Sequence, residues 1–348
     1  MRRIVVLAEG AFGPHTSKTA VGLIRFSRSP VVAVIDSSKA GHTVDEFLGN
    51  GRGIPIVGSV EEALRHEPTT LILGTSPMGG RIPENWREVI KKAIEAGLDV
   101  ESGMHQFLSE DKEFAELARK HGVRLVDYRR VPEEYNRIPD MRAPNAFVVL
   151  VAGLDSNIGK MTTAVELLRT AERMGVEGVV MAPTGQTGIM LEGWGIAVDH
   201  VLSDFVAGAV ELLVRKAVEE HSGRIVLVEG QGSIYHPAYS GVALSLLHGS
   251  RPDALLLVHN PLRKGIRKFE SVKIPPLREA IYHHELIASF IKPARVVAIS
   301  VDTSELTDEE AENLIVELEN ELGIPVSDPI REGGGKLLSV ILEEASRK

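Results

Sequence analysis

Residues 147–163 constrain the fold of this chain more than any other stretch of its sequence. An apolar run, residues 147–152, leads into a polar loop bounded by Gly153 and Gly159, and a helix-compatible segment follows from Lys160. In such an order, backbone N–H groups, a helix dipole and a lysine converge on one anion. The stretch therefore predicts a phosphate-binding loop between a buried strand and a helix.

Two features separate this loop from the common nucleotide-binding pattern. Five residues lie between Gly153 and Gly159, where four are usual, and Met161 occupies the position of the Ser or Thr that normally holds magnesium. Thr162 does not simply replace that hydroxyl, because one step along a helix rotates a side chain by about 100°. We therefore expect a loop that binds phosphate, and the missing hydroxyl weighs against an ordinary magnesium nucleotide without excluding it.

Short β-branched runs alternate with amphipathic stretches along the whole chain, which is typical of an α/β fold with parallel sheets. A length of 348 residues favours two domains. Residues 128–145 contain three prolines and many charges and are predicted to be the linker, so we expect domains at 1–140 and 141–348. The expected strands are 4–7, 31–35, 71–73, 99–101, 123–126, 148–151, 178–181, 225–228, 254–258 and 296–301.

Helices are expected at 84–96 and 107–120, and a third follows Thr307, which forms a capping-box pattern with Glu310. Gly323 stands where that third helix should end. The order of the strands within their sheets cannot be read from the sequence.

Composition narrows the class of protein. Hydrophobic residues make up 43% of the chain and charged residues 25%, as in a soluble globular protein. The net charge of −9 argues against nucleic-acid and membrane partners, although local basic patches remain compatible with it. The chain has no cysteine, and no apolar run approaches the about 18 residues that span a bilayer. We expect a cytoplasmic protein and a homo-oligomer.

Two further motifs support the first. Residues 182–188 form a glycine-rich turn directly after a strand, and residues 225–237 form an apolar strand that ends in Glu229 and a glycine-rich loop. Loops at the carboxyl ends of parallel strands line the ligand crevice, so all three motifs are expected to meet at one ligand. The candidate ligand-binding residues are Gly153, Asp155, Ser156, Asn157, Gly159, Lys160, Met161, Thr162, Thr163, Thr184, Gly185, Gln186, Gly230, Gln231 and Gly232.

Individual roles follow from side-chain chemistry. Lys160 is expected to neutralise a phosphate oxygen, whereas Asp155 and Asn157 either contact the ligand or only stabilise the turn. Thr162 and Thr163 cap the helix or bind phosphate. Glu229 is a candidate metal ligand, general base or structural carboxylate. His236 is a candidate acid or base, or a hydrogen-bonding loop residue.

The remaining histidines, among them His248, His259, His283 and His284, show no metal-ligand spacing, and no metal site is expected. Asp36 ends the second strand, where dinucleotide folds place a ribose-binding acid, but the loop at residues 8–13 lacks the glycine fingerprint. Loops 74–83 and 102–105, with Lys18, Arg81 or Arg87, are candidates for binding substrate carboxylates; ordinary strand-to-helix turns are the alternative.

At these residues the chain resembles a known family. Residues 153–163 and 228–233 look like the phosphate loop and acidic motif of dethiobiotin synthetase and its ATP-dependent relatives. The whole chain resembles a family long catalogued only as a domain of unknown function, which includes D-glutamate N-acetyltransferase. The resemblance is carried by residues 18–25, 74–86, 97–105, 159–163, 184–188, 203–208, 229–241 and 248–253.

The resemblance implies a Rossmann-like N-terminal domain and a P-loop NTPase-like C-terminal domain. It implies acetyl-CoA as the acetyl donor and an acidic D-amino acid such as D-glutamate as the acceptor. The phosphates of coenzyme A would lie on residues 153–163, and Glu229 or His236 would act as the base. Oxyanion donors are expected among the N–H groups of residues 230–233 or 185–188.

Two alternatives stay open. In an ATP-dependent ligase or kinase of the dethiobiotin synthetase type, Lys160 would hold the transferring phosphate and Glu229 a magnesium ion. The third interpretation is a non-catalytic nucleotide-binding or CoA-binding protein.

Overall fold

The computed structural model describes residues 2–75, 80–142 and 144–348. The chain forms two compact units. The first comprises Met1–Arg130 with Ile189–Gly193, and the second comprises Val131–Gly188 with Trp194–Lys348. Each unit contains a six-stranded sheet whose paired strands all run parallel. The predicted α/β class with two parallel sheets is confirmed.

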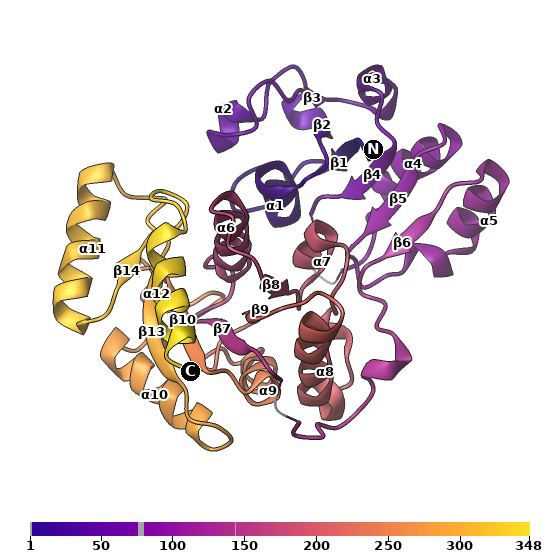
Figure 1. Ribbon diagram of the computed structural model, residues 1–348. Helices are drawn as coiled ribbons and strands as arrows, with labels where there is room; N and C mark the ends of the chain where they lie inside the picture. The colour runs from indigo at the N-terminus through magenta and orange to yellow at the C-terminus, as the bar shows by residue number, and fades with distance from the viewer. Residues whose placement is uncertain (1, 76–79, 143) are drawn as a thin grey trace. The chain divides into compact units, whose positions relative to one another are not determined.

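The sheet of the first unit has the strand order β3-β2-β1-β4-β5-β6. Its strands are β1 (Ile4–Leu7), β2 (Val31–Ile35), β3 (Ile56–Val57), β4 (Thr70–Leu73), β5 (Asp99–Ser102) and β6 (Leu125–Asp127). Its helices, drawn in indigo and violet in Figure 1, are α1 (Lys18–Phe26), α2 (Asp45–Leu48), α3 (Val60–Ala63), α4 (Glu84–Glu95) and α5 (Lys112–His121). Side chains from α3, α4 and α5 share one core with Val5 of β1 and Leu71 of β4.

The sheet of the second unit has the order β14-β13-β10-β7-β9-β8. Its strands are β7 (Phe147–Gly153), β8 (Val179–Ala182), β9 (Ile225–Glu229), β10 (Ala254–His259), β13 (Arg295–Val301) and β14 (Val326–Ser327), and a hairpin of β11 (Gly265–Ile266) and β12 (Phe269–Lys273) lies outside the sheet. The helices after β7 are α6 (Lys160–Arg173), α7 (Gln186–Glu192), α8 (Val206–Glu219), α9 (Ser240–Ser250), α10 (Leu277–Ser289), α11 (Asp308–Leu322) and α12 (Gly335–Ser346).

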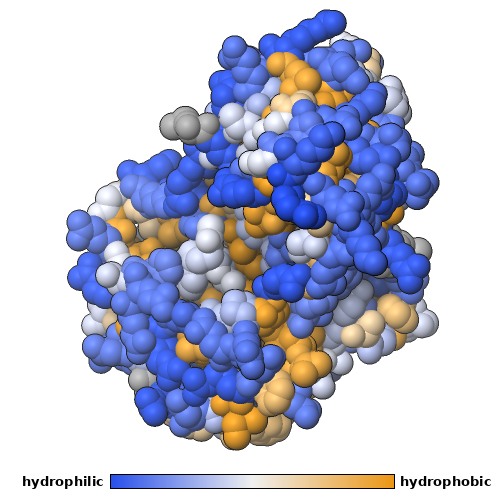
Figure 2. Space-filling model, turned by 90° about the vertical axis from the view of Figure 1, so that its right-hand side faces the viewer, coloured by the Kyte–Doolittle hydropathy of each residue, from blue (hydrophilic) through white to orange (hydrophobic). Residues whose placement is uncertain are grey.

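Helices cover both faces of the second sheet. Buried side chains of α8, α9 and α10 share a core with Val148 and Leu150 of β7. Helix α6 contacts β7, β8 and β9 from the other face and packs against α12. On the side of the molecule drawn in Figure 2, hydrophilic residues cover most of the surface and hydrophobic residues appear in smaller patches between them.

The bounds of the strands and helices show which elements the sequence patterns predicted correctly. The strands expected at 4–7 and 31–35 are found as predicted, and Thr307 and Glu310 form the predicted capping box, with Gly323 at the end of α11. The helix expected from residue 107 is wrong at its start. Residues Leu108–Glu110 form a 3-10 turn, and α5 begins only after Asp111, whose side chain accepts the N–H of Phe114 as an N-cap.

The proline-rich segment after Val131 packs on α8 of the second unit. A Cβ atom on Gly208 would lie 1.9 Å from the carbonyl oxygen of Arg137, so this segment touches the helix where no side chain fits. The carboxylate of Glu211 accepts the N–H groups of Asp140 and Met141 at 2.9 and 3.0 Å. Arg251 lies 3.2 Å from the same carboxylate and donates to the carbonyl oxygen of Met141 at 2.6 Å. The segment is therefore fixed by hydrogen bonds at both ends of a buried charge pair.

Candidate functional site

The three predicted motifs follow neighbouring strands of the second sheet. The loop at 153–163 follows β7, the turn at 182–188 follows β8, and the loop at 230–237 follows β9, which lies between the other two strands. The chain passes from β7 to β8 and β9 on one side and then to β10 on the other. The phosphate loop thus lies at the point where the strand order reverses, which is where open parallel sheets bind their ligands.

Lys160 is the first residue of α6, and its side chain folds back across the loop. Its side chain is 7% exposed, and Nζ donates to the carbonyl oxygen of Asp155 at 2.5 Å. A Cβ atom on Gly153 would lie 2.9 Å from the stem of Lys160, and one on Gly230 would lie 3.2 Å from the same stem and 2.1 Å from the carbonyl oxygen of Val151. Glycine at both positions therefore leaves the space that the lysine stem occupies.

The backbone of the loop has the geometry of an anion-binding turn. Asn157 and Gly159 have φ values of 53° and 100°, in the left-handed region. Alternation of left-handed with ordinary residues turns successive N–H groups toward a common centre. The N-terminus of the 14-residue helix α6 adds its dipole to the same end.

The residues after Lys160 have separate tasks. Met161 is 3% exposed and packs into the interior of the unit. Thr163 is also buried, and its hydroxyl shares a 2.9 Å hydrogen bond with Ser300 of β13, which ties the helix start to the sheet. Thr162 is partly exposed. The departure at Met161 therefore has a packing role, and Thr163 serves as an anchor of the helix.

Glu229, at the end of β9, holds the second loop against the third. Its carboxylate Oε2 accepts the N–H groups of Thr184 and Gly185 at 3.0 and 3.1 Å, and Oε1 accepts the side-chain amide of Gln231 at 3.0 Å. The side chain is 1% exposed. A Cβ atom on Gly188 would lie 2.5 Å from Oε2, so the start of α7 also needs a glycine beside this carboxylate.

His236 is buried at the far end of the third loop. Its Nδ1 accepts the N–H of Ala238 at 3.2 Å, so the neutral ring carries its proton on Nε2. Burial lowers the pKa of His236; the charge of Asp155 opposes this shift and that of Lys160 adds to it. The ring stacks on Tyr239 and meets the edge of Phe269 on β12. Near neutral pH His236 is thus a neutral group whose Nε2–H can donate a hydrogen bond.

Gly232, another predicted contact, forms the tight turn of the third loop. Its φ is 62°, and a Cβ atom would lie 2.6 Å from the carbonyl oxygen of Tyr239. Behind this loop lies a narrow apolar crevice between β7 and α9, lined at one end by His284. Its volume of about 10 Å³ is enough for about one water molecule.

The sequence argument missed the residues that lock the phosphate loop in place. Asp155 is fully buried, and its Oδ2 accepts the guanidinium of Arg263 at 3.0 Å and the backbone N–H of Arg267 at 2.8 Å. Arg263 also donates to the carbonyl oxygen of Ser156 at 2.8 Å. The run of basic residues at 263–268 in an acidic chain was the available signal. Asp155 therefore connects the phosphate loop to the chain after β10.

The ribose-binding role considered for Asp36 in the first unit is not supported by its surroundings. Its carboxylate is fully buried and accepts the backbone N–H groups of Gly10, Phe12 and Ser38. The hydrogen bond from the Ser38 hydroxyl and those from the amides lower the pKa of Asp36 against the opposing effect of burial, which is the largest single influence. Asp36, which follows β2, thus holds the loop after β1 in place.

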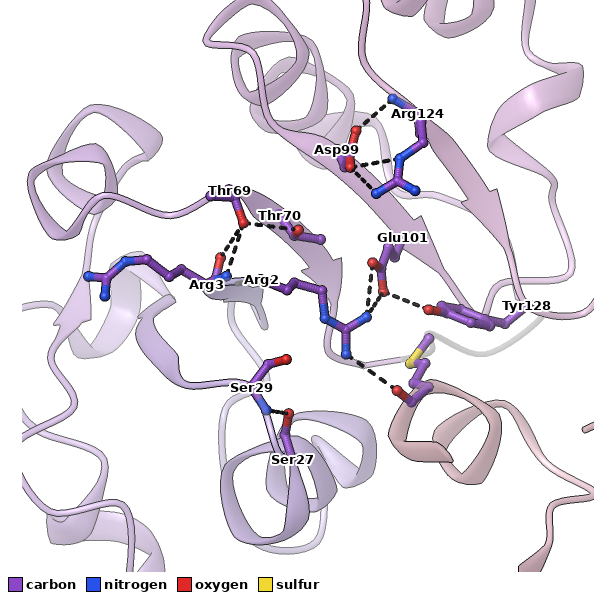
Figure 3. Close-up of polar contacts among 11 residues, drawn as sticks. Arg2, Arg3, Ser27, Ser29, Thr69, Thr70, Asp99, Glu101, Arg124 and Tyr128 are labelled. Atoms are coloured by element: carbon purple, nitrogen blue, oxygen red, sulfur yellow. Dashed lines mark hydrogen bonds and ion pairs between the residues drawn. The ribbon is translucent and has the colours of Figure 1, made fainter. Parts of the chain in front are cut away.

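Charged side chains of the first unit, the candidate Arg87 among them, are engaged in its own framework. Arg87 forms ion pairs with Asp111 and Glu113 at 2.6 and 2.5 Å, so its guanidinium is committed to α5. The two carboxylate oxygens of Glu101, within the segment 97–105, accept one guanidinium nitrogen of Arg2 at 3.1 and 3.0 Å, and one of them also accepts the hydroxyl of Tyr128 at 2.8 Å (Figure 3). Part of the loop expected at 74–83, residues 76–79, lies outside the described residues.

Two searches of the described residues complete the geometry. No helix in ranges 2–75, 80–142 and 144–348 is both long enough and apolar enough to cross a membrane. In the same ranges, no three side chains of His, Cys, Asp or Glu come together in an arrangement that could hold a metal ion.

Comparison with known proteins matches both units. Residues 37–131 match the family model described as a domain of unknown function, DUF1611_N, Rossmann-like domain. Residues 137–338 match the model described as DUF1611_C, P-loop domain. A crystal structure of a DUF1611 family protein from Anabaena variabilis is 36% identical, with a TM-score of 0.88, and the alignment covers 98% of this chain and 99% of that one.

Two relatives carry a functional name. A protein of Tritonibacter scottomollicae named D-glutamate N-acetyltransferase is 36% identical over 284 residues, which are 81% of this chain and 84% of the relative. A protein of the same name from a Pseudoalteromonas species is 34% identical over 276 residues, 79% of this chain and 82% of the relative. With both of its domains matched in the same order, the chain belongs to the DUF1611 family, with a Rossmann-like N-terminal and a P-loop C-terminal domain.

Proposed function

We propose that this protein is an N-acetyltransferase that moves an acetyl group from acetyl-CoA to the amino group of an acidic D-amino acid such as D-glutamate. The similarity to two proteins named D-glutamate N-acetyltransferase, over about 80% of the chain, carries the proposal. The geometry of the second unit supports it, because the loop after β7 offers an anion cradle in which Met161 replaces the usual magnesium-binding hydroxyl.

The phosphate loop fits the pyrophosphate of coenzyme A. The left-handed turns at Asn157 and Gly159 direct N–H groups inward, and Lys160 supplies a positive charge beside them. In the proposed complex Nζ of Lys160 exchanges its bond with the Asp155 carbonyl for a phosphate oxygen. The loop and lysine would thus hold the acetyl donor through its charge.

The chemistry requires a base and an oxyanion donor. The substrate ammonium loses one proton, its nitrogen attacks the thioester carbonyl carbon, and a tetrahedral oxyanion forms. The carbon–sulfur bond then breaks, the nitrogen loses its second proton, and the departing thiolate takes up one proton. The products are the N-acetyl amino acid and free coenzyme A, with one proton released overall.

We assign the role of the base to Glu229 and the role of the oxyanion donor to His236. Glu229 is assigned to the substrate ammonium, because its carboxylate lies at the end of β9, the strand beside the one that leads into the phosphate loop. Neutral His236 donates from Nε2 and is assigned to the oxyanion, because its Nδ1 is occupied by the N–H of Ala238. The sequence left the base open between Glu229 and His236, and this proposal gives the two residues different roles.

The direct test is release of the coenzyme A thiol from acetyl-CoA. We expect release with D-glutamate, little with L-glutamate, and none without an acceptor. Lys160→Ala should raise the KM for acetyl-CoA at least about tenfold, because a charge-assisted contact to phosphate is lost. No thiol release with any acidic amino acid would refute the proposal. Thermal stabilisation by ATP only in the presence of magnesium would support an ATP-dependent ligase in its place.

A further inference from the structure

A strongly basic hairpin comes after β10 in the sequence and contacts the predicted phosphate loop. Residues 262–273, here called the basic hairpin, contain five Lys or Arg residues and one acid, Glu270, in a chain whose net charge is −9. Strands β11 and β12 pair antiparallel within it, and Lys268 at the turn has a φ of 68°. This concentration of positive charge lies beside a predicted anion site.

The root of the basic hairpin is attached to the phosphate loop. Arg263 donates to the carboxylate of Asp155 and to the carbonyl oxygen of Ser156, and the N–H of Arg267 donates to the same carboxylate. On its second strand, Phe269 places its ring edge-on to His236, with centroids 5.4 Å apart. The hairpin is therefore held at one side by the first ligand loop and at the other by the third.

Two positively charged side chains of the basic hairpin form no hydrogen bond or ion pair with the described residues. The positive charge of Arg263 is balanced by Asp155. By contrast, the side chains of Lys264 and Arg267 are exposed, and neither forms a hydrogen bond or ion pair within the described part of the chain. Exposed cations without a structural partner, next to a predicted phosphate cradle, favour a second anionic group on the same ligand.

We propose that Lys264 and Arg267 bind the 3′-phosphate of the acetyl donor. The inference rests on the proposed use of acetyl-CoA and extends it. Lys160 and the loop amides account for the pyrophosphate, whereas the ribose phosphate is a separate dianion that needs its own cations. ADP and ATP lack that group. The basic hairpin therefore selects a 3′-phosphorylated nucleotide over an ordinary one.

The test compares coenzyme A with 3′-dephospho-coenzyme A by calorimetric binding to the full-length protein. Wild type is expected to bind coenzyme A at least about tenfold more tightly, since one tenfold step equals 1.4 kcal/mol and a charge-assisted hydrogen bond exceeds it. The double variant Lys264→Ala/Arg267→Ala should lose that preference and keep its affinity for the dephospho form. Lys273→Ala, which removes an exposed cation of the same hairpin, is the matched control and should keep the preference.

The outcomes separate this inference from the proposed function. A double variant with the wild-type preference would overturn the role of the hairpin, even if acetyl transfer is observed. Equal binding of both compounds by wild type, or binding of neither, would overturn it as well. If the preference exists and depends on Lys264 and Arg267 but no acetyl transfer occurs, the hairpin inference stands and the proposed reaction fails.

Discussion

At the scale of single residues, the site is built from buried polar groups that satisfy one another. Asp155, Lys160 and Glu229 are all nearly or fully buried. Lys160 bonds within its own loop, whereas Asp155 and Glu229 each have a partner in a different loop. A buried charge is tolerated only when it is paired or hydrogen-bonded. The same contacts that pay this desolvation cost also fix the relative positions of the loops after β7, β8, β9 and β10.

Replacement of Glu229 distinguishes a catalytic base from a carboxylate with a structural role alone. In Glu229→Gln the amide oxygen can still accept the N–H groups of Thr184 and Gly185, but the side chain no longer accepts a proton. We expect kcat to fall about 100-fold or more, as for loss of a general base. The thermal shift produced by coenzyme A should remain.

Glu270→Gln, an exposed carboxylate of the basic hairpin, is the control and should leave kcat unchanged. If Glu229→Gln instead lowers the melting temperature and abolishes the coenzyme A shift together with kcat, the carboxylate only positions the second loop.

At the scale of elements, helix α8 depends on glycine where other backbone crosses it. Gly208 faces the carbonyl of Arg137, and Gly249 of α9 would place a Cβ atom 2.3 Å from the carbonyl oxygen of Ala207. These contacts bring the segment after Val131 and helix α9 against α8 at backbone distance. Helix propensity alone would favour alanine at both glycines, so their presence reflects packing.

The pair Gly208→Ala and Gly241→Ala tests this explanation. The first puts a methyl group 1.9 Å from a carbonyl oxygen and should lower the free energy of unfolding by several kcal/mol, or prevent folding. The second lies in α9 with no heavy atom within 4 Å of the added Cβ, and should stabilise by up to about 1 kcal/mol. Urea unfolding measures both. Equal effects of the two substitutions would contradict the packing account.

At the scale of the whole molecule, buried His284 and partly buried His259 make stability depend on pH. Burial lowers the pKa of His259 to about 4 and, as the largest influence, that of His284 to about 4, from 6.5. The unfolded chain therefore binds more protons between pH 6.5 and 4. Stability is fully present above pH 6.5 and falls as the pH drops through this window.

Lowering the pH from 7.5 to 5 should cost roughly 2 kcal/mol for each of these two histidines, measured as the free energy of unfolding in urea. His284→Gln should show a smaller loss over the same range than wild type, whatever its stability at pH 7.5. His121→Gln, at the exposed end of α5, should show the wild-type loss. An unchanged pH dependence in His284→Gln would contradict the assignment.

The sequence by itself determined the elements and the chemical character of the main site. The apolar runs that became β1, β2, β7 and β9 are local patterns, and so are the capping box at Thr307 and the loop leading to Lys160. Local patterns can be read because the forces behind them act between residues close in the chain. The family could be inferred for the same reason, since its motifs are continuous in sequence.

Tertiary structure alone decided how the site is held together. The order β10-β7-β9-β8 brings the three loops side by side, and no pattern in the sequence encodes that order. The bond of Asp155 to Arg263, 108 positions apart, and that of Glu229 to Thr184, 45 positions apart, exist only after the sheet has formed. Other contacts of the folded chain make Asp36 and Arg87 framework residues of the first unit. Partners distant in sequence are chosen by packing and desolvation, which depend on the whole fold.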